Sequence, residues 1–224
     1  MMFDVDSLSE YVPQMSFLAT LLGYMDTTEH TYREFDTETN FYSGGIGSDL
    51  NIYSIYDTDA VKLKFTVRTK TLAGRIKDTT KLMAEMMFKT LFTDEKHLRE
   101  VVAETRSRLK VRLMSAGHQA AVSYSMAGLT LDGWYNDYSM GIGYYDYLVK
   151  LDENFDSEKE KLIKGCEELV KAMFKKEKSL YHARVMKTIM VCLEVQYRNL
   201  IVNLKTLRKK TVQTFLDLRA ISLM

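Results

Sequence analysis

The sequence predicts an α+β domain in which helices cover one face of an antiparallel sheet. Two segments alternate apolar and polar side chains as half-buried strands do, one around Leu50 and Ile52 and the other over residues 61–68. About six further segments repeat apolar side chains at three- and four-residue steps, the spacing of amphipathic helices. Because the helices are grouped rather than strictly interleaved with the strands, an α+β fold is favoured over a parallel α/β sheet.

The first helix is predicted to begin at Pro13, the only proline in the chain. Proline suits a first helical turn because its missing N–H would have no partner there. The apolar face of this helix comprises Val12, Met15, Leu18 or Ala19, Leu22 and Met25. A second helix, to about Tyr42, follows a capping box in which the Thr31 hydroxyl accepts from the Glu34 amide and the Glu34 carboxylate reaches back.

Two strands and a turn come next. Leu50 and Ile52 alternate with polar neighbours, and the second strand places Val61, Leu63, Phe65 and Val67 on one face. The run Asp57-Thr58-Asp59 supplies the turn between the strands. The cluster Gly44-Gly45-Ile46-Gly47 is interpreted as a turn into a strand, because a phosphate-binding loop needs a strand before its glycines and a helix after them.

The remaining elements are predicted to be helices. The first of these helices follows Gly74, and its inward-facing side chains are Ile76, Met83, Met87 and Leu91. The next is capped by Thr93 or Asp94. Its inner face comprises Leu98, Val102, Leu109 and Leu113, and its outer, solvated face comprises Lys96, Glu100, Glu104 and Arg108. Ser157 and Glu160 form a capping box for a further helix that carries Leu162, Cys166, Leu169 and Met173.

Composition restricts the class of protein. A chain of 224 residues can form one large domain or two small ones. Its two cysteines, Cys166 and Cys192, cannot make a disulfide framework, and we interpret Cys166 as a buried structural thiol. The chain lacks the ~18 consecutive apolar residues of a membrane span, and its acidic start does not resemble a signal peptide. We expect a cytoplasmic protein, or one in an organelle matrix if a transit peptide was lost.

The charge is distributed unevenly along the chain. Residues 177–224 contain nine Lys/Arg and three Asp/Glu, a net charge of +6, which leaves −5 for residues 1–176. Periodicity also fades after residue 176. We therefore predict a domain over residues 1–176 and a divergent basic tail over residues 177–224. The tail is interpreted as foreign to the fold, from a shifted reading frame or a junction, with ordinary divergence as the alternative.

No zinc-binding motif of a metallopeptidase is present. An inverted zincin needs His-x-x-Glu-His on a helix, because two imidazoles one turn apart hold zinc while the glutamate activates water. The nearest run is His97-Leu98-Arg99-Glu100-Val101, in which Val101 cannot bind a metal. The other histidines, His30, His118 and His182, lie far apart in the sequence. We therefore predict no catalytic residue, no metal ligand and no cofactor in this chain.

His118 and the aromatic run after it remain as candidate functional residues. Small neighbours around His118 allow another backbone to approach, so this residue is either a peptide-contacting or hinge histidine or a structural one at a helix start. Trp134, Tyr138 and Tyr145 belong to a cluster of aromatic residues. Such a cluster either lines a chamber that holds extended peptides or packs between helices.

Five short motifs recur in an order typical of one protein family. They are Tyr11-Val12-Pro13, Thr31-Tyr32-Arg33-Glu34, Ser43-Gly44-Gly45-Ile46, Ser115-Ala116-Gly117-His118-Gln119-Ala120-Ala121 and Gly143-Tyr144-Tyr145-Asp146-Tyr147-Leu148. In this order and spacing they resemble the third, non-catalytic domain of presequence-protease-type enzymes. These enzymes belong to the insulinase (pitrilysin) family of inverted-zincin metallopeptidases. The resemblance covers roughly Phe3 to Lys176.

The resemblance implies an α/β roll, here truncated at its N-terminal strand, so that residues 1–6 would leave an unpaired sheet edge. It implies that the chain is a non-catalytic, chamber-forming domain or fragment of an oligopeptidase that degrades unfolded peptides. Zinc is then expected in the full-length enzyme, in another domain. The implied partners are the catalytic half of the same peptidase and an unfolded peptide substrate, with neither nucleic acid nor membrane expected.

A second hypothesis stays open. The chain could act alone as an interaction module whose basic tail, with Arg208-Lys209-Lys210, contacts nucleic acid or an acidic surface. Coding sequence upstream that contains His-x-x-Glu-His would favour the first hypothesis. Binding that weakens steeply with salt would favour the second.

Overall fold

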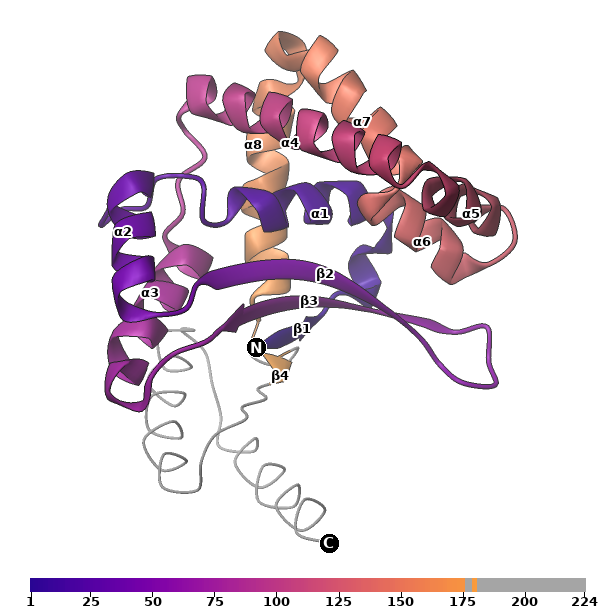
Figure 1. Cartoon of the computed structure of the whole chain (residues 1–224). Coiled ribbons are helices and arrows are strands. Elements are labelled where there is room, and N and C mark those ends of the chain that lie inside the picture. Colours follow the sequence, from indigo (N-terminus) through magenta and orange to yellow (C-terminus); the bar gives the residue numbers. More distant parts are fainter. Residues whose placement is uncertain (176–178, 181–224) are drawn as a thin grey trace, which may run out of the picture.

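The computed structural model describes residues 1–175 and 179–180 and shows an α+β fold, as predicted (Figure 1). A four-stranded antiparallel sheet has the order β2-β3-β1-β4. Its strands are β1 (Met2–Asp4), β2 (Ile46–Ser54), β3 (Val61–Thr69) and β4 (Ser179–Leu180). The helices are η1 (Asp6–Tyr11), α1 (Val12–Leu21), α2 (Tyr32–Tyr42), η2 (Ala73–Arg75), α3 (Ile76–Phe88), α4 (Glu95–Ser115), α5 (Gly117–Ala127), α6 (Leu131–Met140), α7 (Ile142–Glu153) and α8 (Phe155–Met173).

The two central predicted strands form the long hairpin of the sheet. β2 and β3 pair in antiparallel register, with Leu50 opposite Phe65. The alternation predicted for the second strand is confirmed, because Leu63, Phe65 and Val67 are buried. These side chains pack on the face of the sheet that α1 covers, and α1 in turn lies beneath α4 (Figure 1). Helix α1 is therefore the centre of the core, between the sheet and the outer helices.

The prediction of an unpaired sheet edge at residues 1–6 is wrong. β1 pairs with β3 on one side, where Phe3 lies opposite Phe65, and with β4 on the other, where Met2 lies opposite Leu180. Among the described strands, β2 and β4 are the edges. The pairing with β4 brings two residues of the predicted basic tail into the sheet. The rest of that tail, residues 181–224, lies outside the described residues, as do residues 176–178.

Helix starts were predicted correctly where the cap is local. The Thr31–Glu34 capping box at α2 is confirmed, with both reciprocal hydrogen bonds present. Of the two candidates for α4, Asp94 is the cap, and its carboxylate accepts from the His97 amide at 3.0 Å. In the described part of the chain, no helix is both long and apolar enough to cross a membrane.

Two local predictions were wrong. The capping box of Ser157 and Glu160 does not form, because α8 begins at Phe155, directly after Asn154, and Ser157 lies inside the helix. The Ser157 hydroxyl instead donates to the Asn154 carbonyl at 2.9 Å. Leu91 was expected to point inward but is exposed, because α3 ends at Phe88.

Candidate functional site

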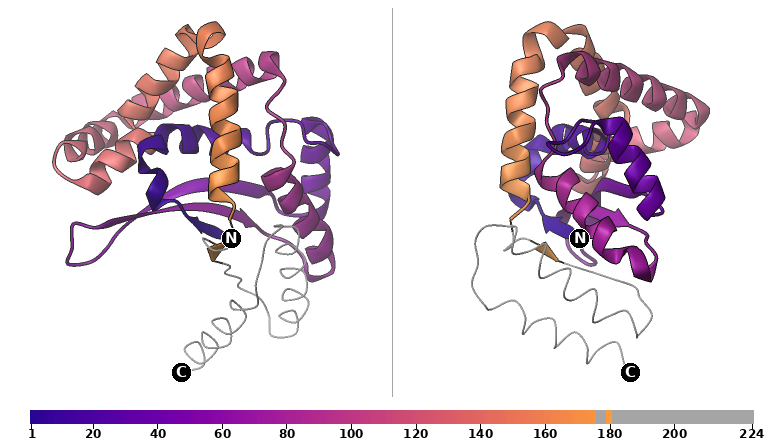
Figure 2. Two further views of the ribbon diagram at one scale, coloured as in Figure 1. Left: turned by 180° about the vertical axis from the view of Figure 1, so that it is seen from behind. Right: turned by 90° about the vertical axis from the view of Figure 1, so that its left-hand side faces the viewer.

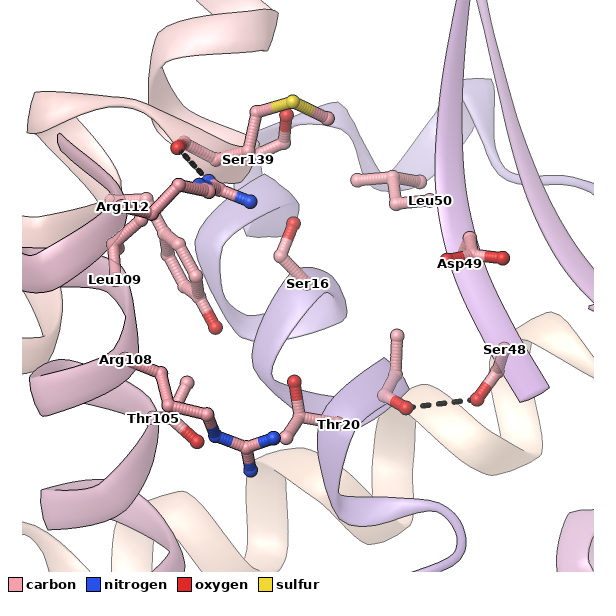
Figure 3. Close-up of a pocket in the computed structure, with 13 residues that line it drawn as sticks. Ser16, Thr20, Ser48, Asp49, Leu50, Thr105, Arg108, Leu109, Arg112 and Ser139 are labelled. Carbon is pink, nitrogen blue, oxygen red and sulfur yellow. Dashed lines mark hydrogen bonds between the residues drawn. The ribbon is translucent and has the colours of Figure 1, made fainter. Parts of the chain in front are cut away.

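A pocket of about 330 Å³ lies between the sheet and the outer helices (Figure 3). Its lining comes from α1, β2, α4 and α6, with one side chain from α7. This volume is at the lower end of the range for small-ligand sites. Arginine and hydroxyl side chains dominate its polar lining, so the pocket offers mainly hydrogen-bond donors to a ligand.

The two arginines of the pocket have different environments. Arg108 forms an ion pair with Glu104 at 3.3 Å, and its guanidinium lies over the Tyr24 ring. Arg112 donates to the backbone carbonyl of Met140, and its guanidinium points into the pocket (Figure 3). Within the described part of the chain, Arg112 has no carboxylate partner. It is therefore the cation of the pocket that is available to a ligand.

One acidic side chain also lines the pocket. Asp49 lies on β2, and its carboxylate pairs with Arg68 at 3.0 Å. This pair lies at the exposed surface of the sheet, where such contacts contribute little to stability. With Asp49 paired to Arg68 and Arg108 paired to Glu104, the described residues leave the charge of Arg112 without a local counterion.

Three of the six hydroxyl side chains that line the pocket, those of Ser48, Thr105 and Ser139, donate to backbone carbonyls. Ser48 donates to Ala19 at 2.8 Å, and Thr105 donates to Val101 at 2.7 Å. Two others differ, because Ser16 Oγ and Tyr144 Oη are buried without a hydrogen-bond partner among the described residues. Buried polar groups of this kind are rare in native proteins and often mark a site for a ligand or an ordered water.

Tyr144 is only 6% exposed. Burial raises its pKa, and the nearby Tyr147 raises it further, so the phenol keeps its proton and remains able to donate. A contact with the Thr20 hydroxyl lowers the pKa and only partly offsets this rise. Tyr144 Oη therefore keeps a proton to donate, and it makes no hydrogen bond of good geometry within the described part of the chain.

The residues predicted from the sequence lie elsewhere. His118 is exposed near the start of α5, and Tyr145 packs half-buried against the core. Trp134 is exposed and stacks on Tyr138, with ring centroids 4.5 Å apart. The structure therefore joins Trp134 with Tyr138 and places none of the four in the pocket. A role for them in contacting peptide stays a prediction.

A surface around α5 carries many exposed apolar side chains. Helix α5 buries none of its residues. The α5 surface comprises Val111, Met114, Val122, Tyr124, Met126, Leu129, Leu131 and Trp134, all exposed. Helix α5 lies at one end of the molecule, the same end as the turn of the β2–β3 hairpin (Figure 2). Apolar exposure of this extent on consecutive elements is typical of a surface that packs against another protein segment.

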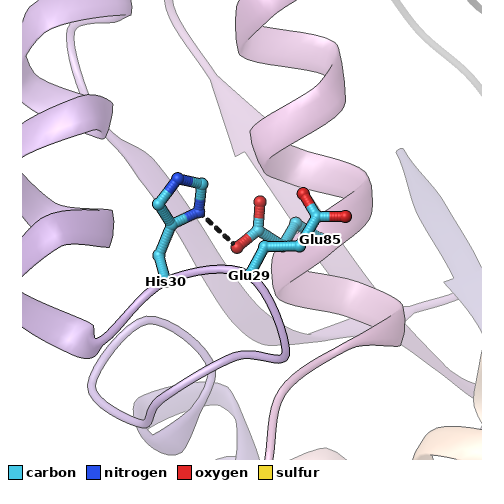
Figure 4. Close-up of side chains that lie close together, drawn as sticks. All are labelled: Glu29, His30 and Glu85. Atoms are coloured by element: carbon cyan, nitrogen blue, oxygen red, sulfur yellow. Dashed lines mark hydrogen bonds and ion pairs between the residues drawn. The ribbon is translucent and has the colours of Figure 1, made fainter.

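A cluster of Glu29, His30 and Glu85 brings potential metal ligands within 4.8 Å of one another (Figure 4). His30 Nδ1 donates to Glu85 Oε1 at 2.7 Å, and the Thr27 hydroxyl donates to the same oxygen. Glu29 pairs with the ammonium groups of Lys81 and Lys89. Because two lysines occupy the Glu29 carboxylate, the cluster is better suited to tying residues 27–30 to α3 than to holding a cation.

The segment His97–Val101, which partly matches the zinc motif, makes structural contacts. His97 Nε2 donates to the Tyr24 carbonyl at 2.6 Å, and its ring stacks on Tyr32 with centroids 4.5 Å apart. Val101, at the position of the second zinc ligand, is buried in the core. The fold and these sites together describe an α+β domain with a donor-lined pocket, an exposed apolar α5 surface and no zincin motif in its sequence.

Comparison with known proteins identifies the family. Residues 1–151 match the model of the family described as Peptidase M-16C associated, so the chain belongs to that family. The resemblance inferred from the sequence motifs is thereby confirmed. The chain is 28% identical over 172 residues to presequence protease 1, chloroplastic/mitochondrial, of Arabidopsis thaliana, an alignment that covers 76% of this chain and 16% of that protein.

Two further relatives also match this chain over a small part of their own length. Protein HypA of Clostridium perfringens is 23% identical over 153 residues, which are 67% of this chain and 16% of HypA. The mitochondrial presequence protease of Drosophila melanogaster is 28% identical over 131 residues, which are 58% of this chain and 12% of that protein. The chain therefore spans about a sixth or less of the length of these relatives.

Proposed function

We propose that the chain is a non-catalytic, chamber-forming domain of a zinc-dependent oligopeptidase that degrades unfolded peptides. The observation that supports this proposal most strongly is the family match over residues 1–151 in a chain whose sequence contains no His-x-x-Glu-His. Similarity to two presequence proteases supports peptides as the substrate class. Zinc would be bound by another domain of the enzyme and would supply the hydrolytic chemistry there.

The partner in this proposal is the catalytic half of the same peptidase. The relatives are about six times longer than the segment they share with this chain, so other domains are available to cover the α5 surface. Val122 and Met114 on this surface are among the most exposed apolar side chains of the molecule. Burying them against another domain would remove apolar area from water, which favours association.

The isolated chain is expected neither to bind stoichiometric zinc nor to cleave peptides. Its described histidines are engaged in structural contacts or lie apart, and the Glu29–His30–Glu85 cluster carries two lysines on one carboxylate. Metal analysis of the purified chain and a peptidase assay with and without chelator measure both properties. Chelator-sensitive turnover that disappears in His97→Ala would contradict this expectation, and zinc binding lost in Glu85→Gln would assign a metal to the cluster.

Gene context gives an independent test of the proposal. Coding sequence upstream and in frame with this chain should contain His-x-x-Glu-His on a predicted helix. Sequencing the flanking DNA in all frames decides this, and the same data show whether residues 177–224 continue the reading frame of the domain. A complete gene for this chain with no peptidase sequence beside it would count against the proposal. We propose a cytoplasmic location for the enzyme, or an organelle matrix; the two presequence proteases are named as chloroplastic/mitochondrial and mitochondrial proteins.

The alternative function, a stand-alone module that contacts nucleic acid or an acidic surface, rests on the net charge of +6 over residues 177–224. Most of this segment lies outside the described residues. Binding of the chain to duplex DNA or to anionic vesicles, measured at about 50 and 200 mM salt, separates the two hypotheses. Tight binding that falls steeply with salt would favour the alternative.

A further inference from the structure

We propose that the pocket between α1, β2, α4 and α6 binds the C-terminal carboxylate of a peptide, with Arg112 as its principal cation and Ser16 and Tyr144 as hydroxyl donors. This inference deepens the proposed function and rests on it for the identity of the ligand as a peptide. It assigns a role to a site in which the predicted residues His118, Trp134, Tyr138 and Tyr145 take no part.

Arg112 is the cation that a carboxylate in this pocket would meet. The guanidinium of Arg112 points into the pocket (Figure 3). Among residues 1–175 and 179–180 it has one hydrogen bond, to the Met140 carbonyl, which leaves other N–H donors free. A planar guanidinium matches a carboxylate, because two parallel hydrogen bonds can form between them. The neighbouring Arg108 is already paired with Glu104. The pocket therefore presents about one uncompensated positive charge, which suits a monoanion better than a phosphate dianion.

Two buried hydroxyls of the pocket have no hydrogen-bond partner among the described residues, which independently indicates a ligand. Ser16 Oγ and Tyr144 Oη are buried and lack partners among the described residues, although neighbouring hydroxyls such as Ser48 and Thr105 are satisfied by carbonyls. A buried donor without a partner costs free energy that an acceptor ligand would recover. Both side chains belong to the pocket that Arg112 enters. An oxyanion held by Arg112 would supply the missing acceptor.

The apolar border and the volume of the pocket also fit the end of a peptide. Met140 borders the pocket and is itself exposed, so an apolar side chain next to the carboxylate would find an apolar neighbour. The volume of about 330 Å³ has room for the last one or two residues of a peptide rather than a long segment. A chain end is therefore a better fit than the middle of a peptide.

Equilibrium dialysis of the full 224-residue chain tests the proposal, because its readout does not depend on the assembly state. The probes are N-acetyl-Ala-Leu as the free acid, the same dipeptide as the amide, N-acetyl-glutamate α-amide, whose one carboxylate is on the side chain, and inorganic phosphate. The free acid should bind about tenfold or more tightly than the amide, the difference expected from charge-assisted hydrogen bonds. Equal binding of acid and amide, or no binding of either, would overturn the proposal. Tighter binding of phosphate or of the glutamate probe would overturn the assignment to a peptide C-terminus.

Variants locate the site. Arg112→Gln should weaken binding of the free acid by about tenfold or more, and Tyr144→Phe by a smaller factor. Lys110→Gln is the matched control, since Lys110 is exposed on the same helix, carries the same charge and does not line the pocket. Arg112→Lys keeps the charge and should retain part of the affinity. Equal losses in Lys110→Gln and Arg112→Gln would show nonspecific attraction and sink the proposal. Carboxylate binding by a chain that ignores the catalytic half would refute the proposed function and leave the pocket in place.

Discussion

Phe174→Ala is expected to destabilise the domain by about 3–5 kcal/mol, the range for removing a buried phenylalanine ring. Phe174 follows the end of α8, is 6% exposed and makes edge-to-face contacts with three rings. Its closest ring partner is Phe3 in β1, with centroids 5.0 Å apart. The ring therefore fastens the last described helix to the sheet.

Urea denaturation of the wild type and the variant measures this change in the free energy of unfolding. Phe41→Ala is the matched control, because Phe41 is 67% exposed and its loss should cost less than about 1 kcal/mol. Equal effects of the two substitutions would mean that the end of α8 does not anchor the fold. The C-terminal boundary of the stable domain would then lie before residue 174.

Asp137→Ala is expected to destabilise the domain by about 2–4 kcal/mol, because two partly buried amides would lose a charged acceptor. The Asp137 carboxylate lies at the end of α6 and caps the start of α7. It accepts from the Ile142 amide at 2.9 Å and from the Gly143 amide at 3.0 Å. A negative charge at a helix N-terminus is also favoured by the helix dipole.

Thermal and urea unfolding of Asp137→Ala should be compared with Asp146→Ala, which removes an exposed carboxylate from α7 itself. Asp146→Ala should change the free energy of unfolding by less than about 0.5 kcal/mol. Gly141 and Gly143 lie so close to Asp137 that a larger side chain has no room. A Cβ on Gly143 would lie 2.6 Å from Asp137 Oδ2. A stable Asp137→Ala variant would show that the amides find another acceptor.

The sequence was sufficient for features that depend on neighbours along the chain. The Thr31–Glu34 capping box and the alternation of β3 each involve residues a few positions apart, so local spacing predicts them. The false capping box at Ser157 shows the limit of such reasoning. The same residue spacing occurs inside helices, and only the observed start of α8 at Phe155 distinguishes the two cases.

Features that depend on distant parts of the chain could not be predicted. The pairing of β1 with β4 joins residues about 178 positions apart, so the sequence suggested a free edge at a strand that is paired on both sides. The pocket likewise combines α1, β2, α4 and α6, and Arg112 has the same local pattern as the solvated charges of α4. Asp137 was missed because its partners follow a glycine break that reads as the end of one helix rather than as a capped start of the next.

The central claim is that this domain docks on the catalytic half of a peptidase through the α5 surface. Size-exclusion chromatography with light scattering tests it directly, using the chain alone and with the separately expressed catalytic half, which the proposed function expects upstream with a His-x-x-Glu-His motif. Alone, the chain should self-associate, because its apolar α5 surface is exposed to water. With the catalytic half it should form a monodisperse one-to-one complex. Val122→Glu, at a residue that is 64% exposed, should abolish that complex.

Leu72→Glu provides the control, because Leu72 is 78% exposed and lies between β3 and η2, at the opposite end of the sheet from α5 (Figure 1). This variant should form the complex as the wild type does. A wild-type chain that stays monomeric at micromolar concentration and does not bind the catalytic half would contradict the account, and the chain would then be a self-sufficient module.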